Sequence, residues 1–263
     1  MDLQLKDKKV LLTGATRGIG YGAARRFAEA GAKVWIHGSR KESCETAQKR
    51  LLEEFPKTSI AISPCNFEDS QAVAEWITQL PAMDILVNNL GVYRSEDFFS
   101  MSDKWWFKHY EINVMSGVRL SRQMLPLMLE NNWGRILFIS SECSRLVPQD
   151  LIAYSASKAA LEAISRGLAK TTRNTGVTVN SLQPGSTLTE GAISFLEDQA
   201  AQTDSTPEQV ASDFFVSQRP ASTLQRFAQV DEVAATIVYY CSPLAAATNG
   251  STIAVDGGST LGG

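Results

Sequence analysis

Short apolar runs alternate along this chain with longer segments in which apolar residues recur at helical spacing. Because parallel strands are buried on both faces, continuous apolar runs of this length predict such strands. The runs lie near residues 10–13, 33–37, 60–62, 85–87, 136–139, 177–180 and 252–255. The helices expected between them lie near residues 18–30, 41–55, 69–79, 103–130, 151–175 and 231–241. This alternation predicts an α/β fold, a doubly wound seven-stranded parallel sheet with helices on both faces.

Residues 186–218 depart from this alternation. The segment contains no Lys or Arg, although it carries six acidic residues. Two helices are expected in it, around residues 190–202 and 207–217. Long insertions of this kind often cover a site, so we interpret it as a helical lid, with a solvated acidic face as the alternative. Since no Pro-, Gly- or Ser-rich linker divides the chain, residues 1–263 are expected to form a single domain.

Composition narrows the class of protein. The 263 residues carry a net charge of −3 and no basic run, which argues against nucleic acid as a partner. No stretch approaches the ~18 apolar residues of a membrane span, so no membrane association is expected. The charged first residues differ from a signal peptide. Scattered cysteines and two isolated histidines predict reduced thiols, a cytoplasmic location and no metal site.

A glycine-rich loop follows the first expected strand and precedes the first expected helix. It reads Thr13-Gly14-Ala-Thr-Arg17-Gly18-Ile-Gly20. Glycines allow the backbone to turn sharply, and the N-terminus of the following helix offers free N–H groups to a pyrophosphate. The position of the loop therefore predicts a dinucleotide site, with a turn that binds no ligand as the alternative.

The end of the second expected strand bears on the choice of dinucleotide. NAD sites commonly place a carboxylate there, but this chain reads His37-Gly38-Ser39-Arg40. Arg40 can bind a 2′-phosphate, Ser39 can donate to it, and Arg17 adds a second cation nearby. The sequence therefore favours NADP(H) over NAD(H), unless both arginines are merely solvated surface charges.

Tyr154 and Lys158 are four residues apart, and Ser141 lies thirteen residues before Tyr154. On a helix this spacing places the phenol and the ammonium on one face. A neighbouring ammonium favours phenolate, so the pKa of Tyr154 is expected to fall below its usual ~10. Such a phenol can exchange a proton with a substrate oxygen. A chance pair on an exposed helix is the alternative.

Together these motifs resemble the short-chain dehydrogenase/reductase family over nearly the whole chain. The glycine loop matches the family pattern T-G-x-x-x-G-x-G, and Asn88-Asn89-Leu90-Gly91 stands where the family has N-N-A-G. Pro184, Gly185 and Thr189 match the later pattern P-G-x-x-x-T. The resemblance implies a Rossmann fold that transfers a hydride between nicotinamide and a carbonyl or alcohol carbon.

The resemblance also implies a catalytic tetrad of Asn113, Ser141, Tyr154 and Lys158. In it Ser141, with Ser140 as the rival, polarises the substrate oxygen and Tyr154 exchanges the proton. Lys158 holds the nicotinamide ribose, and Asn113 holds a water in a distorted helical turn. A binding-only NADP(H) redox sensor is the alternative function, and an epimerase or dehydratase is a weaker third.

The other expected contacts follow from the same resemblance. The substrate is expected to be a small carbonyl or alcohol. The protein is expected to form a homo-oligomer, a tetramer or dimer. Residues 105–108 of the fourth helix either form a contact in this oligomer or belong to the core. The acidic lid argues against highly anionic substrates. Position alone suggests pocket walls at Tyr93, Cys143, Gln149 and Phe195. The expected cofactor-binding residues are Gly14, Thr16, Arg17, Gly18, Ile19, Gly20, Ser39, Arg40, Asn66, Phe67, Asn89, Gly91, Tyr154, Lys158, Pro184, Gly185, Thr187 and Thr189.

Overall fold

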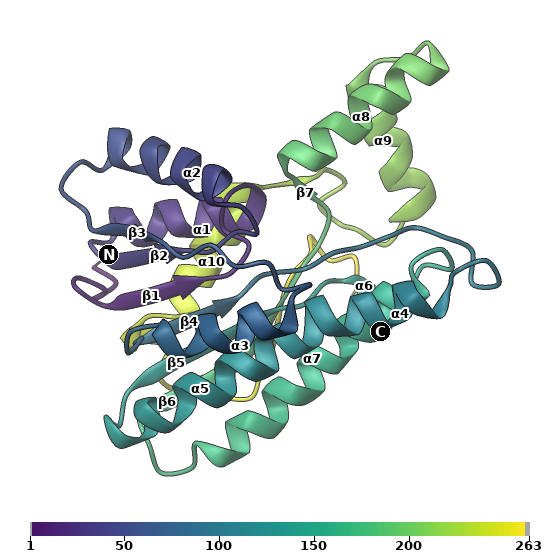
Figure 1. The fold of residues 1–263 in the computed structure, drawn as a ribbon. Coiled ribbons are helices and arrows are strands. Elements are labelled where there is room, and N and C mark those ends of the chain that lie inside the picture. Colours follow the sequence, from purple (N-terminus) through teal and green to yellow (C-terminus); the bar gives the residue numbers. More distant parts are fainter. Residues whose placement is uncertain (1, 261–263) are drawn as a thin grey trace.

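Seven parallel strands form the central sheet of the computed structural model, which describes residues 2–260 (Figure 1). Their order is β3-β2-β1-β4-β5-β6-β9, so the direction of the strand order reverses between β1 and β4. This arrangement confirms the predicted doubly wound Rossmann sheet. The strands are β1 (Lys9–Leu12), β2 (Lys33–Ile36), β3 (Ile60–Ile62), β4 (Ile85–Asn88), β5 (Gly134–Ile139), β6 (Val177–Pro184) and β9 (Thr252–Val255).

Helices cover both faces of the sheet, and the two apolar cores lie between them and the strands (Figure 1). One face carries α1 (Gly18–Glu29), α2 (Lys41–Glu54) and α10 (Val230–Tyr240). The other face carries α3 (Ser70–Gln79), α5 (Ser116–Glu130) and α7 (Ile152–Thr171). The short elements are α4 (Asp103–His109), η1 (Tyr110–Met115), α6 (Cys143–Leu146) and η2 (Pro243–Ala245).

Burial explains why the sequence signal for the strands was clear. Every residue of β4, β5 and β6 is buried, so these strands need side chains that tolerate apolar surroundings on both faces. Arg135 on β5 is the charged side chain in these three strands, and its guanidinium donates to the carbonyl oxygens of Gly134, Gly176 and Ser242. Such bonds satisfy a buried cation without an acidic partner.

The region 103–130 differs from the single predicted helix. It is divided into α4, a π-helical turn over Tyr110–Met115 (η1) and α5. A π-turn adds a residue to the helical repeat and is frequently found at functional sites. Here the turn contains Asn113, which is 2% exposed.

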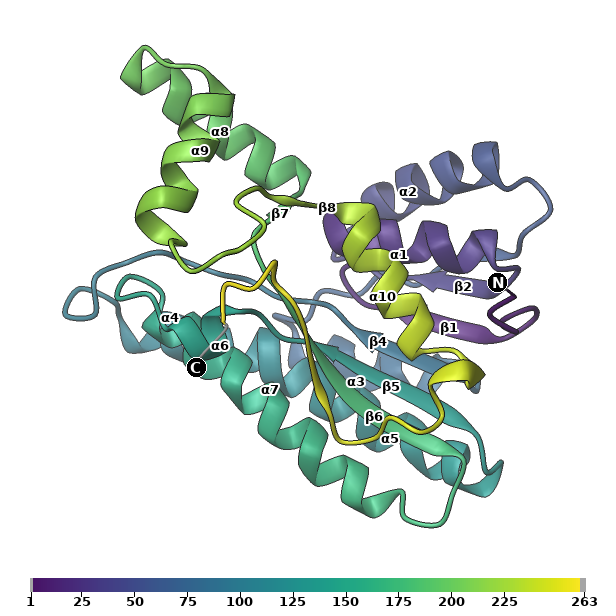
Figure 2. The same cartoon turned by 180° about the vertical axis from the view of Figure 1, so that it is seen from behind.

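The expected lid helices are present as α8 (Glu190–Thr203) and α9 (Pro207–Gln218). Both project away from the sheet as a pair, as the two opposite views show (Figures 1 and 2). The strand before α8, β7 (Thr187–Leu188), pairs in parallel with β8 (Ala228–Gln229), which leads into α10. Thr189 caps α8 and Thr206 caps α9 through their hydroxyl groups, which explains where each helix begins.

Within residues 2–260, no helix combines the length and the hydropathy that crossing a membrane requires. In the same range, no group of three His, Cys, Asp or Glu side chains is placed to hold a metal ion.

Candidate active site

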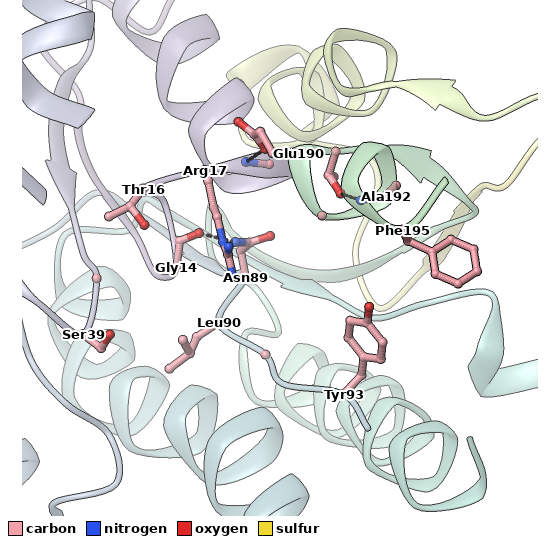
Figure 3. A pocket seen from close by; sticks show the side chains of 15 residues that line it. Gly14, Thr16, Arg17, Ser39, Asn89, Leu90, Tyr93, Glu190, Ala192 and Phe195 are labelled. Atoms are coloured by element: carbon pink, nitrogen blue, oxygen red, sulfur yellow. Dashed lines mark hydrogen bonds between the residues drawn. The ribbon is translucent and has the colours of Figure 1, made fainter. Parts of the chain in front are cut away.

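The carboxyl ends of the central strands lie beside two adjoining cavities. One, of about 550 Å3, follows the glycine loop (Figure 3). The other, of about 430 Å3, lies between β5, α7 and the base of the lid. Both cavities are lined in common by Asn89, Gly91, Tyr93 and Thr189. Doubly wound sheets bind ligands at this edge, where the strand order reverses.

The glycine loop has the backbone shape that the sequence predicts. Gly14 and Gly18 have φ values of +62° and +56°, a region that side chains disfavour. A Cβ on Gly20 would collide with the carbonyl oxygen of Gly14 and with Asn89. The Nδ2 of Asn89 donates to the carbonyl oxygens of Thr13 (3.0 Å) and Gly14 (2.9 Å) and so ties the loop to β4.

A lid carboxylate contacts this loop. The backbone N–H of Gly18, the first residue of α1, donates to Oε2 of Glu190 at 2.8 Å (Figure 3). Helix N-termini attract anions because their N–H groups are unpaired and the helix dipole is positive there. Glu190 therefore uses the anion-binding end of α1 that the sequence assigns to a pyrophosphate.

A third hollow, of about 720 Å3, continues from the glycine loop toward α2. Its lining includes Arg17, Ser39 and Arg40, the residues that the sequence assigns to a 2′-phosphate, together with Thr16. Within residues 2–260, neither arginine forms an ion pair with an acidic side chain. Glu42 also lines the hollow and opposes anion binding there.

Lys158 is held at the end of β5. Its Nζ donates to the carbonyl oxygen of Ile139 at 2.8 Å and lies 5.6 Å from the centre of the Tyr154 ring. Its side chain is buried, whereas Tyr154 is half-buried. Both line the smaller cavity together with Ser141, so three of the four expected tetrad residues meet in one space.

The fourth, Asn113, supports this cavity from the π-turn. Its Oδ1 accepts from the backbone N–H of Val92 at 2.7 Å, and its Nδ2 donates to the carbonyl oxygen of Val92 and to Oγ of Ser157, both at 2.9 Å. Because Ser157 immediately precedes Lys158, these bonds fix α7 against the segment after β4. Gly91 completes the packing, since a Cβ there would lie 3.3 Å from the Lys158 Nζ.

The structure separates the two serine candidates by their partners. The Ser140 hydroxyl lies 2.7 Å from Oε1 of Glu162 and 3.1 Å from the carbonyl oxygen of Lys158, two acceptors that share its single proton. The Ser141 hydroxyl accepts from the backbone N–H of Cys143 at 3.2 Å. Ser140 thus has structural partners on α7, while the Ser141 hydroxyl lies between Cys143 and Tyr154 in the smaller cavity.

The pKa of Tyr154 contradicts the direction expected from the sequence. Removal of the phenolate from water raises this pKa above 10.0, and the Cys143 thiol adds to the rise, whereas a hydrogen bond with Ser141 opposes it. Burial also lowers the pKa of Lys158 to about 8. The expected fall is wrong because desolvation, the largest influence on this pKa, raises it. Tyr154 is therefore protonated at neutral pH, the form that donates a proton.

Several expected contact residues lie elsewhere. The Phe67 side chain is buried in a cluster with His37 and Trp76, so only its backbone can face a ligand. Asn66 is exposed, and its Oδ1 accepts from the N–H of Glu68. Gln149 is exposed and lines neither of the two adjoining cavities.

The remaining expected residues lie around the two adjoining cavities. Ile19, Cys143, Pro184, Gly185 and Thr187 line the smaller one. The lid residue Phe195 lines the larger one, and Tyr93 lines both (Figure 3).

Sequence reasoning missed several residues that line the smaller cavity, among them Glu142, Phe214, Arg219 and Phe227. Glu142 directly follows Ser141, and Arg219 is the first basic residue after the acidic segment. Those positions in the sequence were the signals that could have marked the two residues as part of the site. Neither indicated that the two side chains would meet.

Comparison with known proteins agrees with this geometry. A family model described as enoyl-(acyl carrier protein) reductase matches residues 14–260. The uncharacterized oxidoreductase YvrD of Bacillus subtilis (strain 168) is 42% identical, with 98% of each chain covered. The 3-oxoacyl-[acyl-carrier-protein] reductase FabG of Vibrio cholerae is 32% identical, with 97% of this chain and 98% of the relative covered.

Among solved structures, the L-sorbose reductase of Gluconobacter frateurii, complexed with NADPH and L-sorbose, superposes with a TM-score of 0.92. It is 27% identical, and 99% of each chain is covered. The chain therefore belongs to the short-chain dehydrogenase/reductase family, whose Rossmann fold it has. It is an NAD(P)-dependent oxidoreductase acting on carbonyl or alcohol groups.

Replacing Glu190 by Gln is expected to tighten NADPH binding about threefold to tenfold, because the carboxylate competes with phosphate for the Gly18 N–H and repels it. Fluorescence titration with NADPH measures the dissociation constant. Glu197→Gln, an exposed change on the same helix outside the larger cavity, is the matched control. Unchanged or weaker binding in Glu190→Gln would contradict the competition.

Proposed function

We propose that this chain is an NADPH-preferring carbonyl reductase, also able to oxidise the alcohol, with Asn113, Ser141, Tyr154 and Lys158 as its tetrad. The observation that carries the proposal is the continuity of the two adjoining cavities. One follows the glycine loop, the other contains Ser141, Tyr154 and Lys158, and they share part of their walls. The intact tetrad favours catalysis over the binding-only sensor.

The residues present fit a dinucleotide. Because Gly20 has no Cβ, the glycine loop can pack closely against Asn89. The Gly18 N–H already binds one anionic group, the carboxylate of Glu190. Ile19, Thr187 and Thr189 line the smaller cavity, which supports their assignment to the nicotinamide end. When bound, the nicotinamide supplies or accepts the hydride.

The protein contributes position and a proton. Ser141 donates a hydrogen bond to the substrate oxygen and polarises the carbonyl. Tyr154, protonated because burial raises its pKa, donates a proton to the same oxygen as negative charge develops. Lys158 orients the ribose hydroxyls, and Asn113 together with a water would connect Lys158 to solvent, from which the proton on Tyr154 is restored. In the oxidative direction the same groups accept the proton.

NADP(H) preference is supported by the hollow beside α2. Arg17 and Arg40 line it without acidic partners in the described residues, and Ser39 offers a hydroxyl donor. Two cations outweigh the one opposing carboxylate, Glu42. The bound NADPH named for the G. frateurii reductase supports the same choice.

We also propose that the enzyme is cytoplasmic and forms a homotetramer or homodimer. The four cysteines are free, in keeping with a reducing compartment. Phe107 on α4 is 74% exposed and Phe99 is 93% exposed, so a second copy would remove large aromatic surfaces from water. Light scattering after size-exclusion chromatography distinguishes the oligomers from a monomer.

Replacing Tyr154 by Phe removes the proton donor but keeps the ring. NADPH binding is expected to survive, while kcat for carbonyl reduction falls about 10²–10⁴-fold. NADPH fluorescence and stopped-flow absorbance measure the two properties. Turnover equal to that of the wild type would reject the assignment of Tyr154.

Replacing Arg40 by Asp places a negative charge in the hollow beside α2. The dissociation constant for NADPH is expected to rise about tenfold or more, and that for NADH is expected to change little. Calorimetry with each cofactor measures the difference. Equal losses for both would reject a role at the 2′-phosphate.

The reductive pH profile follows from the lowered pKa of Lys158. Its ammonium is charged below about pH 8 and neutral above, so kcat/KM for reduction is expected to fall as pH rises through about 8. The raised pKa of Tyr154 keeps the proton donor loaded over the same range. Initial rates from pH 6 to 10 test this. A reductive rate that rises with pH would contradict it.

A further inference from the structure

A buried ion pair joins the lid to the residue after Ser141. Nε of Arg219, at the C-terminal end of α9, donates to Oε1 of Glu142, and the two side chains are only 9% and 3% exposed. Both residues line the smaller cavity. Burying two charges is costly unless their remaining hydrogen-bonding groups are also satisfied.

Arg219 is incompletely satisfied. Its Nη1 donates to the carbonyl oxygen of Gln218 at 2.8 Å, while Nη2 contacts only the sulfur of Cys143, at 3.9 Å. Sulfur is a weak acceptor, and no oxygen in residues 2–260 accepts from Nη2. A buried donor without an oxygen acceptor costs free energy, which a ligand oxygen would recover.

This donor lies close to the proposed chemistry. Cys143, which Nη2 contacts, also donates its backbone N–H to the Ser141 hydroxyl at 3.2 Å. The ring of Phe214 lies 5.3 Å from the guanidinium carbon and restricts it from the lid side. An oxygen bound by Nη2 would therefore belong to a group near the reacting carbonyl.

The surrounding charge selects the kind of oxygen. The charged side chains that line the cavity are Lys158, Glu142 and Arg219. Glu142 already compensates Arg219, and Lys158 is assigned to the cofactor. A substrate carboxylate would compete with Glu142 and be repelled by it, whereas a neutral hydroxyl would accept from Nη2 without that repulsion.

We infer that Arg219 is a specificity-determining residue that binds a second, neutral oxygen of the substrate beside the reacting carbonyl. Glu142 acts through Arg219, as a positioning residue that holds the guanidinium and cancels its charge. The favoured substrate class is hydroxy ketones, over plain ketones and keto acids. This inference rests on the proposed function for the identity of the reacting site.

The test compares three ketones of nearly equal size: hydroxymethyl ethyl ketone, diethyl ketone and α-ketobutyrate. Their dissociation constants are measured by calorimetry on the enzyme saturated with NADP+, which cannot reduce them. The wild type is expected to bind hydroxymethyl ethyl ketone about tenfold tighter than either of the others, the effect of one hydrogen bond to a charged donor. Steady-state kcat/KM with NADPH should give the same order.

Two variants separate charge from structure. Glu142→Gln keeps an oxygen acceptor for Arg219 but removes the compensating charge, so α-ketobutyrate should gain about tenfold relative to hydroxymethyl ethyl ketone. The double variant Glu142→Gln/Arg219→Met removes both charges, avoids an unpaired buried ion and should bind all three ketones alike. The control, Glu232→Gln/Arg226→Met, removes an exposed ion pair outside the cavity and should keep the wild-type order.

The inference is overturned if the wild type binds the three ketones equally or binds none of them. It is also overturned if the double variant keeps the wild-type order, or if Glu142→Gln gains nothing for the keto acid. Thermal unfolding of each variant confirms that folded protein is compared. If no carbonyl supports the oxidation of NADPH, the proposed function is refuted instead. That outcome is separate because the binding order is measured without turnover.

Discussion

The hydrogen bond from Lys158 to the carbonyl oxygen of Ile139 is the constraint on which the site depends. It joins α7 to the carboxyl end of β5, so the helix that carries Tyr154 is fixed relative to the strand that leads to Ser141. The bonds of Asn113 to Val92 and Ser157 hold the same helix from the other side. The chemistry of the smaller cavity is therefore set by rigid elements rather than by loops, which suits an enzyme that must position a proton within hydrogen-bonding reach.

Desolvation decides the protonation states in this site. It raises the pKa of Tyr154 and lowers the pKa of Lys158, so both side chains shift toward their neutral forms. The same surroundings explain the cost of the Glu142–Arg219 pair, which is buried in the cavity wall. A cavity that penalises charge so strongly is consistent with neutral substrates and with a phenol that gives up its proton only as the substrate oxygen gains negative charge.

The sheet and the glycine loop could be predicted from the sequence because both depend on local patterns. Apolar runs mark strands buried on both faces, and Gly14 and Gly18 stand where the backbone needs positive φ. The π-turn was not visible as a helical pattern, because the bonds that fix Asn113 come from Val92 and Ser157, far away in the sequence. Periodicity alone predicted one uninterrupted helix there, although the family resemblance indicated a distorted turn.

Contacts between distant segments could not be predicted from the sequence. Glu142 and Arg219 are separated by 77 positions, and only the packing of the lid base brings them together. The direction of the Tyr154 pKa shift was mistaken for the same reason: the spacing to Lys158 is local, but burial is a property of the whole fold. Phe67 likewise follows its strand as expected, yet its ring is taken up by the core.

The most direct measurement is a crystal structure of the enzyme with NADP+ and a bound ketone. The account predicts the Tyr154 hydroxyl and the Ser141 hydroxyl both within about 2.6–3.2 Å of the ketone oxygen, with the Lys158 Nζ on the ribose hydroxyls. A ketone oxygen that contacts neither hydroxyl, or a Tyr154 ring turned away from the nicotinamide, would contradict it.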